Sequence, residues 1–209
     1  MQQGLLPLFP LELVLFPGGE LPLHIFEDRY KEMIGEAISE STEFGIVLAN
    51  SKGLANIGCT ATVDRVLREY TDGRLDILTV GRRRFEILLV NEERAFLRGA
   101  VDFFDDEAST VPSDVRERAV AGHSDACTVS GEPPLDAASL SDPLLSFRLV
   151  QAVPDLLFRQ TILNLRNEAD RMARLADFLP RWAASQSRLQ KIKTVAPTNG
   201  HGHAKVPGQ

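Results

Sequence analysis

The side chains that could carry chemistry are few, and their spacing does not assemble a catalytic or metal-binding motif. His24 precedes Ile25-Phe26-Glu27, which supplies neither the second histidine nor the glutamate position of a helical zinc-hydrolase motif. Cys59 and Cys127 have no nearby second pair for zinc, so each is predicted to be a small buried hydrophobe. His201-Gly202-His203 could hold a metal weakly, but its surroundings are typical of flexible chain.

Motifs for nucleotides and for nucleophilic catalysis are also missing from the sequence. There is no Gly-x-x-x-x-Gly-Lys-Ser/Thr loop to cradle phosphates, and no serine lies in a Gly-x-Ser-x-Gly elbow. A triad dispersed along the chain stays open as an alternative, because spacing alone does not test it. The sequence therefore predicts a protein that is not an enzyme and has no catalytic residue, metal or cofactor.

Charge is unevenly distributed, and this bears on the class of partner. The net charge is -6, but residues 1–110 hold 11 Lys/Arg against 19 Asp/Glu, and the remainder hold 12 against 10. An acidic front half makes nucleic acid an unfavourable partner, because phosphate contacts need a basic stripe. The triplet Arg82-Arg83-Arg84 is predicted to be a solvated strand end.

Membrane and export signals are not evident. No apolar run approaches the roughly 18 residues that a membrane-spanning helix needs. The start, Met1-Gln2-Gln3-Gly4, lacks the basic region of a signal peptide. A cytoplasmic protein without membrane contact is the expectation.

The first hundred residues are typical of β structure with one inserted helix. Apolar positions from Tyr30 to Ile38 fall on one helical face. Phe16-Pro17-Gly18-Gly19 signals a turn and Asp72-Gly73 a hairpin, so Gly18 and Gly73 are predicted to have positive φ. Short strands and few long helices favour closure into a pseudo-barrel. The expected strands cover residues 5–16, 21–25, 44–49, 58–70, 75–80, 85–90 and 96–104.

The pattern becomes helical from residue 111. A weak helix is expected at 113–126, a central one at 142–152 opened by Ser141-Asp142-Pro143, one after Pro154-Asp155, and a last one capped by Asn167. In the last helix Arg171, Arg174 and Arg181 are expected to point largely outward. The predicted division is a β-rich lobe at 1–107, a helical lobe at 111–190 and a disordered tail at 191–209.

Five motifs in order along residues 5–104 resemble the amino-terminal substrate-binding domain of Lon proteases. They are Leu6-Pro7-Leu8-Phe9-Pro10 running to Phe16-Pro17-Gly18, Leu21-Pro22-Leu23-His24-Ile25 with the helix after it, Phe44-Gly45-Ile46-Val47, Ile57-Gly58-Cys59-Thr60-Ala61, and Asp72-Gly73 followed by Gly81-Arg82-Arg83-Arg84-Phe85. The later helices are similar more loosely, which extends the resemblance to about residue 182.

The resemblance implies an α+β fold, with a PUA-like β pseudo-barrel followed by a small helical bundle. It implies a non-catalytic module that recognises unfolded or degron-bearing polypeptide, with a separate protease or chaperone as a possible partner. The chain ends where Lon would continue into its ATPase and peptidase, so neither activity is expected. Four apolar residues are predicted to contact peptide near the turn and the lobe junction: Phe16, Leu21, Phe103 and Phe104.

An RNA-binding function is the main alternative, because PUA-like barrels elsewhere bind RNA and fold does not fix function. The basic stretch 171–209, with 7 Lys/Arg and one Asp, favours it, while the acidic front half opposes it. An adaptor that delivers clients to a separate protease is a further alternative.

Overall fold

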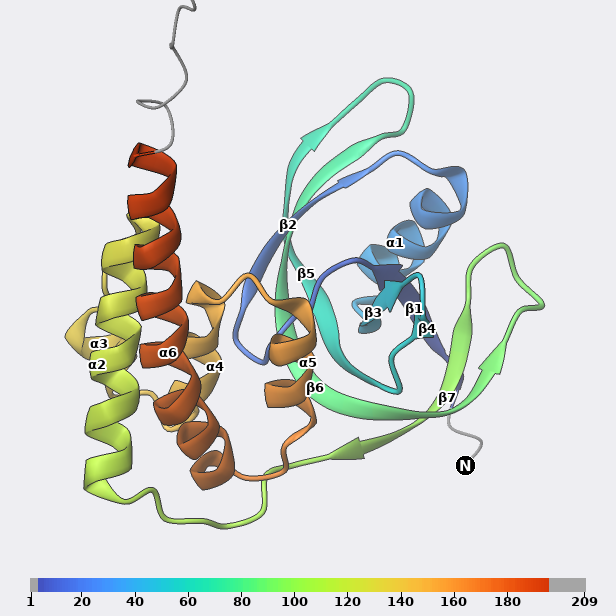
Figure 1. Ribbon diagram of the computed structural model, residues 1–209. Coiled ribbons are helices and arrows are strands. Elements are labelled where there is room, and N and C mark those ends of the chain that lie inside the picture. Colours follow the sequence, from blue (N-terminus) through green and yellow to red (C-terminus); the bar gives the residue numbers. More distant parts are fainter. Residues whose placement is uncertain (1–3, 196–209) are drawn as a thin grey trace, which may run out of the picture.

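Strands fill the first half of the chain and helices the second, in a computed structural model that describes residues 4–195 (Figure 1). The α+β class expected from the sequence is confirmed. The strands are β1 Leu6–Leu11, β2 Glu20–Ile25, β3 Phe44–Asn50, β4 Gly53–Leu54, β5 Ile57–Glu69, β6 Leu75–Asn91 and β7 Arg98–Phe104. The helices are α1 Asp28–Glu40, α2 Ser113–Ser130, α3 Ala137–Leu140, α4 Leu145–Leu149, α5 Leu156–Asn164 and α6 Glu168–Val195, with a 3-10 turn at Val150–Ala152.

The predicted pseudo-barrel is present, and one parallel pairing closes it. Neighbouring strands follow the order β1, β7, β6, β5, β3, and β1 then pairs with β3 in parallel. β2 adds to β6 and β4 to β3. Helix α1 packs Tyr30, Met33 and Ile34 against the barrel core, where these side chains are at most 7% exposed. Burial of one helical stripe fixes α1 on the barrel.

The two turn glycines adopt the predicted backbone. Gly18 has φ 71° and Gly73 has φ 80°, both in the left-handed region that residues with a side chain rarely enter. The Phe16-Gly19 turn lies across the middle of β6, where the Gly18 amide donates to the Gly81 carbonyl at 2.9 Å. A Cβ at Gly81 would lie 2.2 Å from the Phe16 carbonyl oxygen, so only glycine fits at this crossing.

β6 is one strand of 17 residues, and the prediction of two separate strands at 75–80 and 85–90 is wrong. Its first part pairs with β2 and its last part with β7, while β5 pairs with it from Leu75 to Glu86 through three register shifts. The chain bends at these irregularities instead of breaking. Gly81 and the three arginines after it therefore lie inside a strand.

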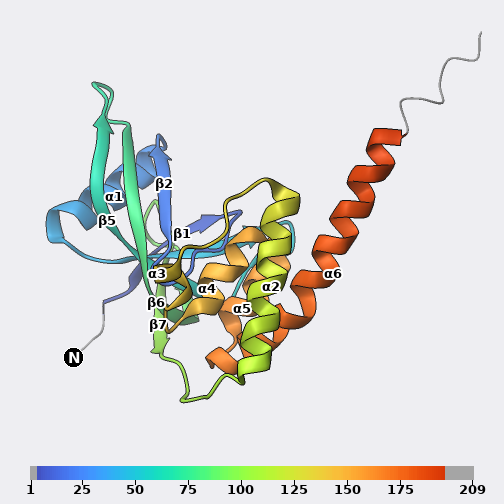
Figure 2. The ribbon, with the colours of Figure 1, turned by 90° about the vertical axis from the view of Figure 1, so that its left-hand side faces the viewer.

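The helices form a bundle beside the barrel. α2 packs along α6, and α4 and α5 lie between this pair and the barrel (Figures 1 and 2). The barrel and the bundle share a hydrophobic core that includes Val14, Phe16 and Leu48 from the barrel side. The boundary proposed between residues 107 and 111 falls in the segment that connects β7 to α2. No helix within residues 4–195 is long and apolar enough to cross a membrane.

Helix boundaries differ from the expectation at two places. α4 begins at Leu145 instead of residue 142, because the Asp142 carboxylate accepts the Leu144 amide at 2.8 Å and holds a turn there. α6 runs to Val195, past the start of the tail predicted at 191, since Lys and Gln are good helix formers. Residues 196–209, including His201-Gly202-His203, lie outside the described residues.

Candidate functional site

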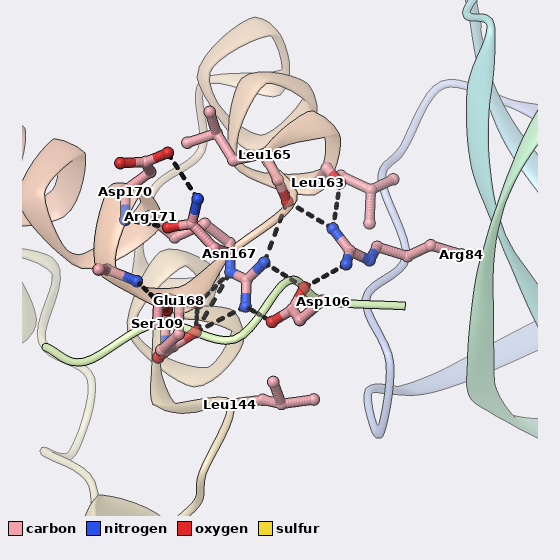
Figure 3. Close-up of polar contacts among 12 residues, drawn as sticks. Arg84, Asp106, Ser109, Leu144, Leu163, Leu165, Asn167, Glu168, Asp170 and Arg171 are labelled. Carbon is pink, nitrogen blue, oxygen red and sulfur yellow. Dashed lines mark hydrogen bonds and ion pairs between the residues drawn. The ribbon is translucent and has the colours of Figure 1, made fainter. Parts of the chain in front are cut away.

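A buried ion cluster joins the barrel to the bundle (Figure 3). Arg84 on β6 and Arg171 on α6 both donate to Asp106, which lies in the segment between β7 and α2. Arg84 also donates to the Leu163 carbonyl at 3.1 Å, and Arg171 donates to Glu168 at 2.8 Å. Arg171 is 0% exposed and Arg84 is 4% exposed. The cluster therefore ties three separate parts of the chain together.

Two guanidinium groups and two carboxylates make this cluster electrically balanced. Burial lowers the pKa of Arg84, with Asp106 acting in the opposite direction. Burial also acts to lower the pKa of Arg171, but its hydrogen bonds to Asp106 and Glu168 outweigh it, so that pKa is raised. Because every charge has a partner inside the cluster, its role is to hold the junction.

Two predictions about arginines are wrong. Arg84 was expected at a solvated strand end and Arg171 on the outer face of the last helix, and both are buried. Their partner, Asp106, stands in an acidic run, Asp105-Asp106-Glu107, which marks the end of the barrel. The pairing depends on the meeting of barrel and bundle, so no local pattern could reveal it.

Phe16 lies inside the same junction. Its side chain is 1% exposed and stacks on Phe147 of α4 with ring centroids 5.4 Å apart. The Arg159 guanidinium lies 5.4 Å from the ring. The bundle covers Phe16 in this structure, so Phe16 presents no exposed surface to a peptide here, and its predicted peptide contact stays a prediction. An apolar residue after a turn signal is a core candidate as much as a surface one.

The other three predicted residues lie apart from one another. Phe104 packs under Arg84 and Arg166, whose guanidinium carbons are 4.6 and 4.2 Å from its ring. Leu21, on β2, is half-buried against the core beneath α1. Phe103 lines a cavity at one side of the barrel. The structure does not assemble the four into one site, and their peptide contact stays untested.

Phe103 belongs to a groove of about 740 Å³ bounded by β7, the start of β1 and α1. We call it the β7–α1 groove. Phe103 packs edge-on against Phe85, and the Arg83 guanidinium covers its ring at 3.9 Å. Apolar side chains make up much of the lining: Leu5, Leu6, Pro7, Met33, Ala37, Leu88, Ala100, Val101 and Phe103. A groove of this size and character can hold several apolar side chains of a partner.

A β-bulge gives the groove an exposed apolar rim. The register of β6 on β7 shifts between Ile87 and Leu89, which leaves Leu88 as the extra residue. Leu88 is 68% and Leu89 64% exposed, so two consecutive leucines face solvent where a regular strand would turn one inward. The sequence reasoning missed Leu88 because it read 85–90 as an ordinary strand.

The charged residues around the groove are largely paired with each other. Arg83 pairs with Glu43 at 3.4 Å, Arg98 with Glu93 at 3.3 Å, and Arg94 with Glu36. The bonds to Arg94 lower the pKa of Glu36. A lining in which most charges are neutralised selects weakly for charge in a ligand.

One edge of β7 lies open beside this groove. β1 pairs with β7 only at Arg98 and Gly99, and no other described strand pairs with that edge. The stretch from Ala100 to Phe104 is paired on its β6 side alone. An unpaired edge can form main-chain hydrogen bonds with an added strand.

The described histidines have structural partners. The His24 ring nitrogen Nδ1 lies 2.5 Å from the Asp76 carboxylate, which also accepts the Tyr70 hydroxyl at 2.8 Å. His123 hydrogen-bonds the Leu149 carbonyl through Nδ1 at 3.1 Å, so that nitrogen carries the proton. Within residues 4–195 no group of three His, Cys, Asp or Glu side chains is arranged to hold a metal ion.

Neither thiol is expected to react in the folded protein. Both are buried, as the sequence predicts, and burial raises the pKa of Cys59 to about 12 and also raises that of Cys127. At pH 8 the Cys59 thiolate fraction is then roughly one in ten thousand. We expect a chromogenic disulfide reagent to label neither thiol at pH 8 within minutes and to label both in denaturant. Rapid native labelling of either one would contradict this burial.

Comparison with known proteins assigns the chain to a family. The family model of the ATP-dependent protease La (LON) substrate-binding domain matches residues 5–192. The chain belongs to this family. The LON substrate-binding domain thus accounts for both the barrel and the bundle, and the resemblance seen in the sequence is confirmed.

Individual relatives are more distant, and the chain covers only part of them. A Lon protease of Roseiflexus castenholzii is 28% identical over 192 residues, which is 84% of this chain and 24% of that protein. One of Parabacteroides distasonis is 31% identical over 110 residues, 48% of this chain and 13% of that protein. The chain therefore spans about a quarter or less of the length of these relatives.

Solved structures of Lon N-terminal domains share the fold. A Lon N-terminal domain protein from Xanthomonas campestris has a TM-score of 0.69 at 22% identity, covering 85% of this chain and 100% of that one. The N-terminal domain of a Mycobacterium avium complex Lon protease has a TM-score of 0.61 at 16% identity, covering 84% and 98%. The barrel followed by a bundle is thus the fold of these domains.

Proposed function

We propose that this chain is a non-catalytic module that binds an extended, apolar segment of an unfolded polypeptide in the β7–α1 groove. The observation that carries the proposal is the combination of an apolar groove, a charge-paired rim and an open strand edge on β7. Membership of a family described as substrate-binding supports it. Holding a client and delivering it to a separate protease both begin with this binding step.

The chemistry of the groove suits a partner of varied sequence. An added strand along Ala100–Phe104 would gain main-chain hydrogen bonds whatever its side chains are. Every second side chain of that strand would face the groove, where Leu88 and Phe103 offer apolar contact. Extended and apolar segments are exposed in unfolded proteins and buried in folded ones.

Binding is expected to be weak and to survive high salt. A single groove with few unpaired charges supports about micromolar affinity once a flexible peptide has been ordered. Its charges are paired within the protein, so counterion release contributes little, unlike binding to RNA. Arg171, one of the seven basic residues that favoured RNA, is buried in the ion cluster and cannot contact phosphate.

Replacing Leu88 by aspartate is expected to weaken binding of a labelled, permanently unfolded substrate by about tenfold or more, because a charge enters the apolar rim. Phe103→Ala is expected to act in the same direction by removing the aromatic wall. The measurement is fluorescence anisotropy at low and high salt, with ATP present and absent. Leu67→Asp is the matched control, since Leu67 is 54% exposed on the β5–β6 hairpin, away from the groove lining.

Three results would count against the proposal in different ways. Equal loss of binding in the Leu67 and Leu88 variants would mean that the polypeptide does not bind in the groove. Cleavage of the substrate or dependence on ATP would deny that the module is non-catalytic. Tight RNA binding that falls steeply with salt, together with no polypeptide binding up to about 1 mM, would favour the RNA alternative.

A further inference from the structure

A second cavity lies wholly in the bundle, and nothing in the proposed function uses it. Its volume is about 690 Å³, within the range that binds small molecules. It is walled by parts of α2, α5, α6 and the turns between α2 and α5. Its apolar wall is formed by Val129, Pro133, Leu135, Val153, Pro154 and Trp182.

Arg159 gives this bundle cavity an unneutralised positive charge. Its guanidinium donates to the Val14 carbonyl at 3.1 Å, its Nε is buried without a hydrogen-bond partner, and no carboxylate in the described chain pairs with it. Burial lowers the pKa of Arg159, yet an arginine stays charged at neutral pH. A partly buried cation without an anionic partner is unfavourable, and an incoming carboxylate would remove that cost.

Among the described cations that line the bundle cavity, Arg159 is the one without a carboxylate partner. Arg148 is paired with Asp142 at 3.0 Å. His123 is held neutral by burial, which lowers its pKa, and its Nε2 lies 3.3 Å from the Cys127 thiol, which burial keeps protonated. Glu132 lines the cavity from an exposed position at its rim.

We propose that the bundle cavity binds a carboxylate attached to an apolar group, with Arg159 contacting the carboxylate and the wall around Trp182 contacting the apolar part. Two sources carry this chemistry, the carboxyl-terminal residue of a polypeptide and a free organic acid. The proposal is independent of the β7–α1 groove, since the two cavities share no lining residue.

The sole tryptophan of the chain lines the bundle cavity, so its fluorescence reports on occupancy. The probes are an N-acetylated peptide that ends in leucine with a free carboxylate, the same peptide as its carboxamide, and octanoate. We expect the acid peptide or octanoate to change the Trp182 emission saturably. The carboxamide is expected to bind about tenfold more weakly, the effect of one hydrogen bond to a charged group.

Two variants in the bundle cavity test whether Arg159 causes the preference for the acid over the carboxamide. Arg159→Met is expected to abolish the preference for acid over amide. Glu132→Gln, an exposed substitution that leaves the fold intact, is expected to raise acid affinity about twofold and leave amide affinity unchanged. Leu88→Asp, in the groove, is expected to leave the Trp182 response as it is, which separates failure of this proposal from failure of the proposed function.

The wild-type protein alone can overturn the inference. Equal binding of the acid and carboxamide peptides together with no response to octanoate, or no change in Trp182 emission from any probe up to about 1 mM, would show that Arg159 does not bind a carboxylate. Response to octanoate but not to the acid peptide supports the site and assigns it to a free organic acid. Response to the acid peptide but not to octanoate supports the site and assigns it to the carboxyl-terminal residue of a polypeptide.

Discussion

Replacing Phe16 by alanine is expected to lower the free energy of unfolding by about 3–5 kcal/mol, the usual cost of removing a buried phenylalanine. Phe16 is 1% exposed, stacks on Phe147 and lies in the core that the barrel shares with the bundle. The loss would leave a void where the two parts meet, because the Phe16-Gly19 turn is fixed on Gly81 and cannot close over it.

Urea denaturation followed by circular dichroism measures this change. Phe26→Ala is the matched control, since Phe26 is 59% exposed and the same atoms are removed. We expect that control to fall within about 1 kcal/mol of the wild-type protein. If both variants lowered the free energy of unfolding by the same small amount, the turn would not be part of the shared core. Phe16 would then be a candidate peptide contact.

Replacing Arg171 by methionine is expected to lower the free energy of unfolding by about 3 kcal/mol or more. Methionine fills similar space, so the change removes the charge more than the volume. Asp106 keeps only Arg84 as a partner, and Glu168 loses its ion pair and keeps its hydrogen bonds from Ser146. Carboxylates that lose a buried cation are left partly uncompensated, which is costly, and the segment around Asp106 loses its ion pair to α6.

Arg174→Met is the control for this prediction, because Arg174 is exposed on the same helix three residues later. Its effect on the free energy of unfolding, measured by urea denaturation as for Phe16, is expected to be within about 0.5 kcal/mol. Equal effects of the two substitutions would mean that the cluster adds little to stability. In that case the barrel and the bundle would be held together by apolar packing and by their other polar contacts, such as Arg84 with the Leu163 carbonyl and Arg166 with Glu86.

Features decided by a few neighbouring residues could be predicted from the sequence. The turn glycines at 18 and 73, the helix from Asp28, and the cap of α6 by Asn167 all follow from local chemistry. The Asn167 side chain accepts the Asp170 amide at 2.8 Å, as such a cap requires. Barrel closure followed from the abundance of short strands.

Features that depend on contacts between distant residues could not be predicted from the sequence. The exposure of Leu88 depends on a bulge set by the pairing of Leu89 with Ala100, and the burial of Arg84 depends on Asp106 and on the carbonyl of Leu163. Phe103 and Phe104 are consecutive in β7, so their side chains lie on opposite faces of the strand. Which of them meets a groove and which meets arginines is set by the way β7 lies between α1 and the bundle.

Amide hydrogen exchange on β7 tests the central claim most directly, with a permanently unfolded substrate added at saturation. Strand addition predicts that amides within Ala100–Phe104 exchange more slowly in the complex, because an unpaired edge gains hydrogen bonds. The edge strand β2 serves as the internal control, since β6 is its one partner among the described strands, and its exchange is expected to stay unchanged. Protection of β2 in place of β7, or no added protection at saturation, would contradict the assignment of the groove.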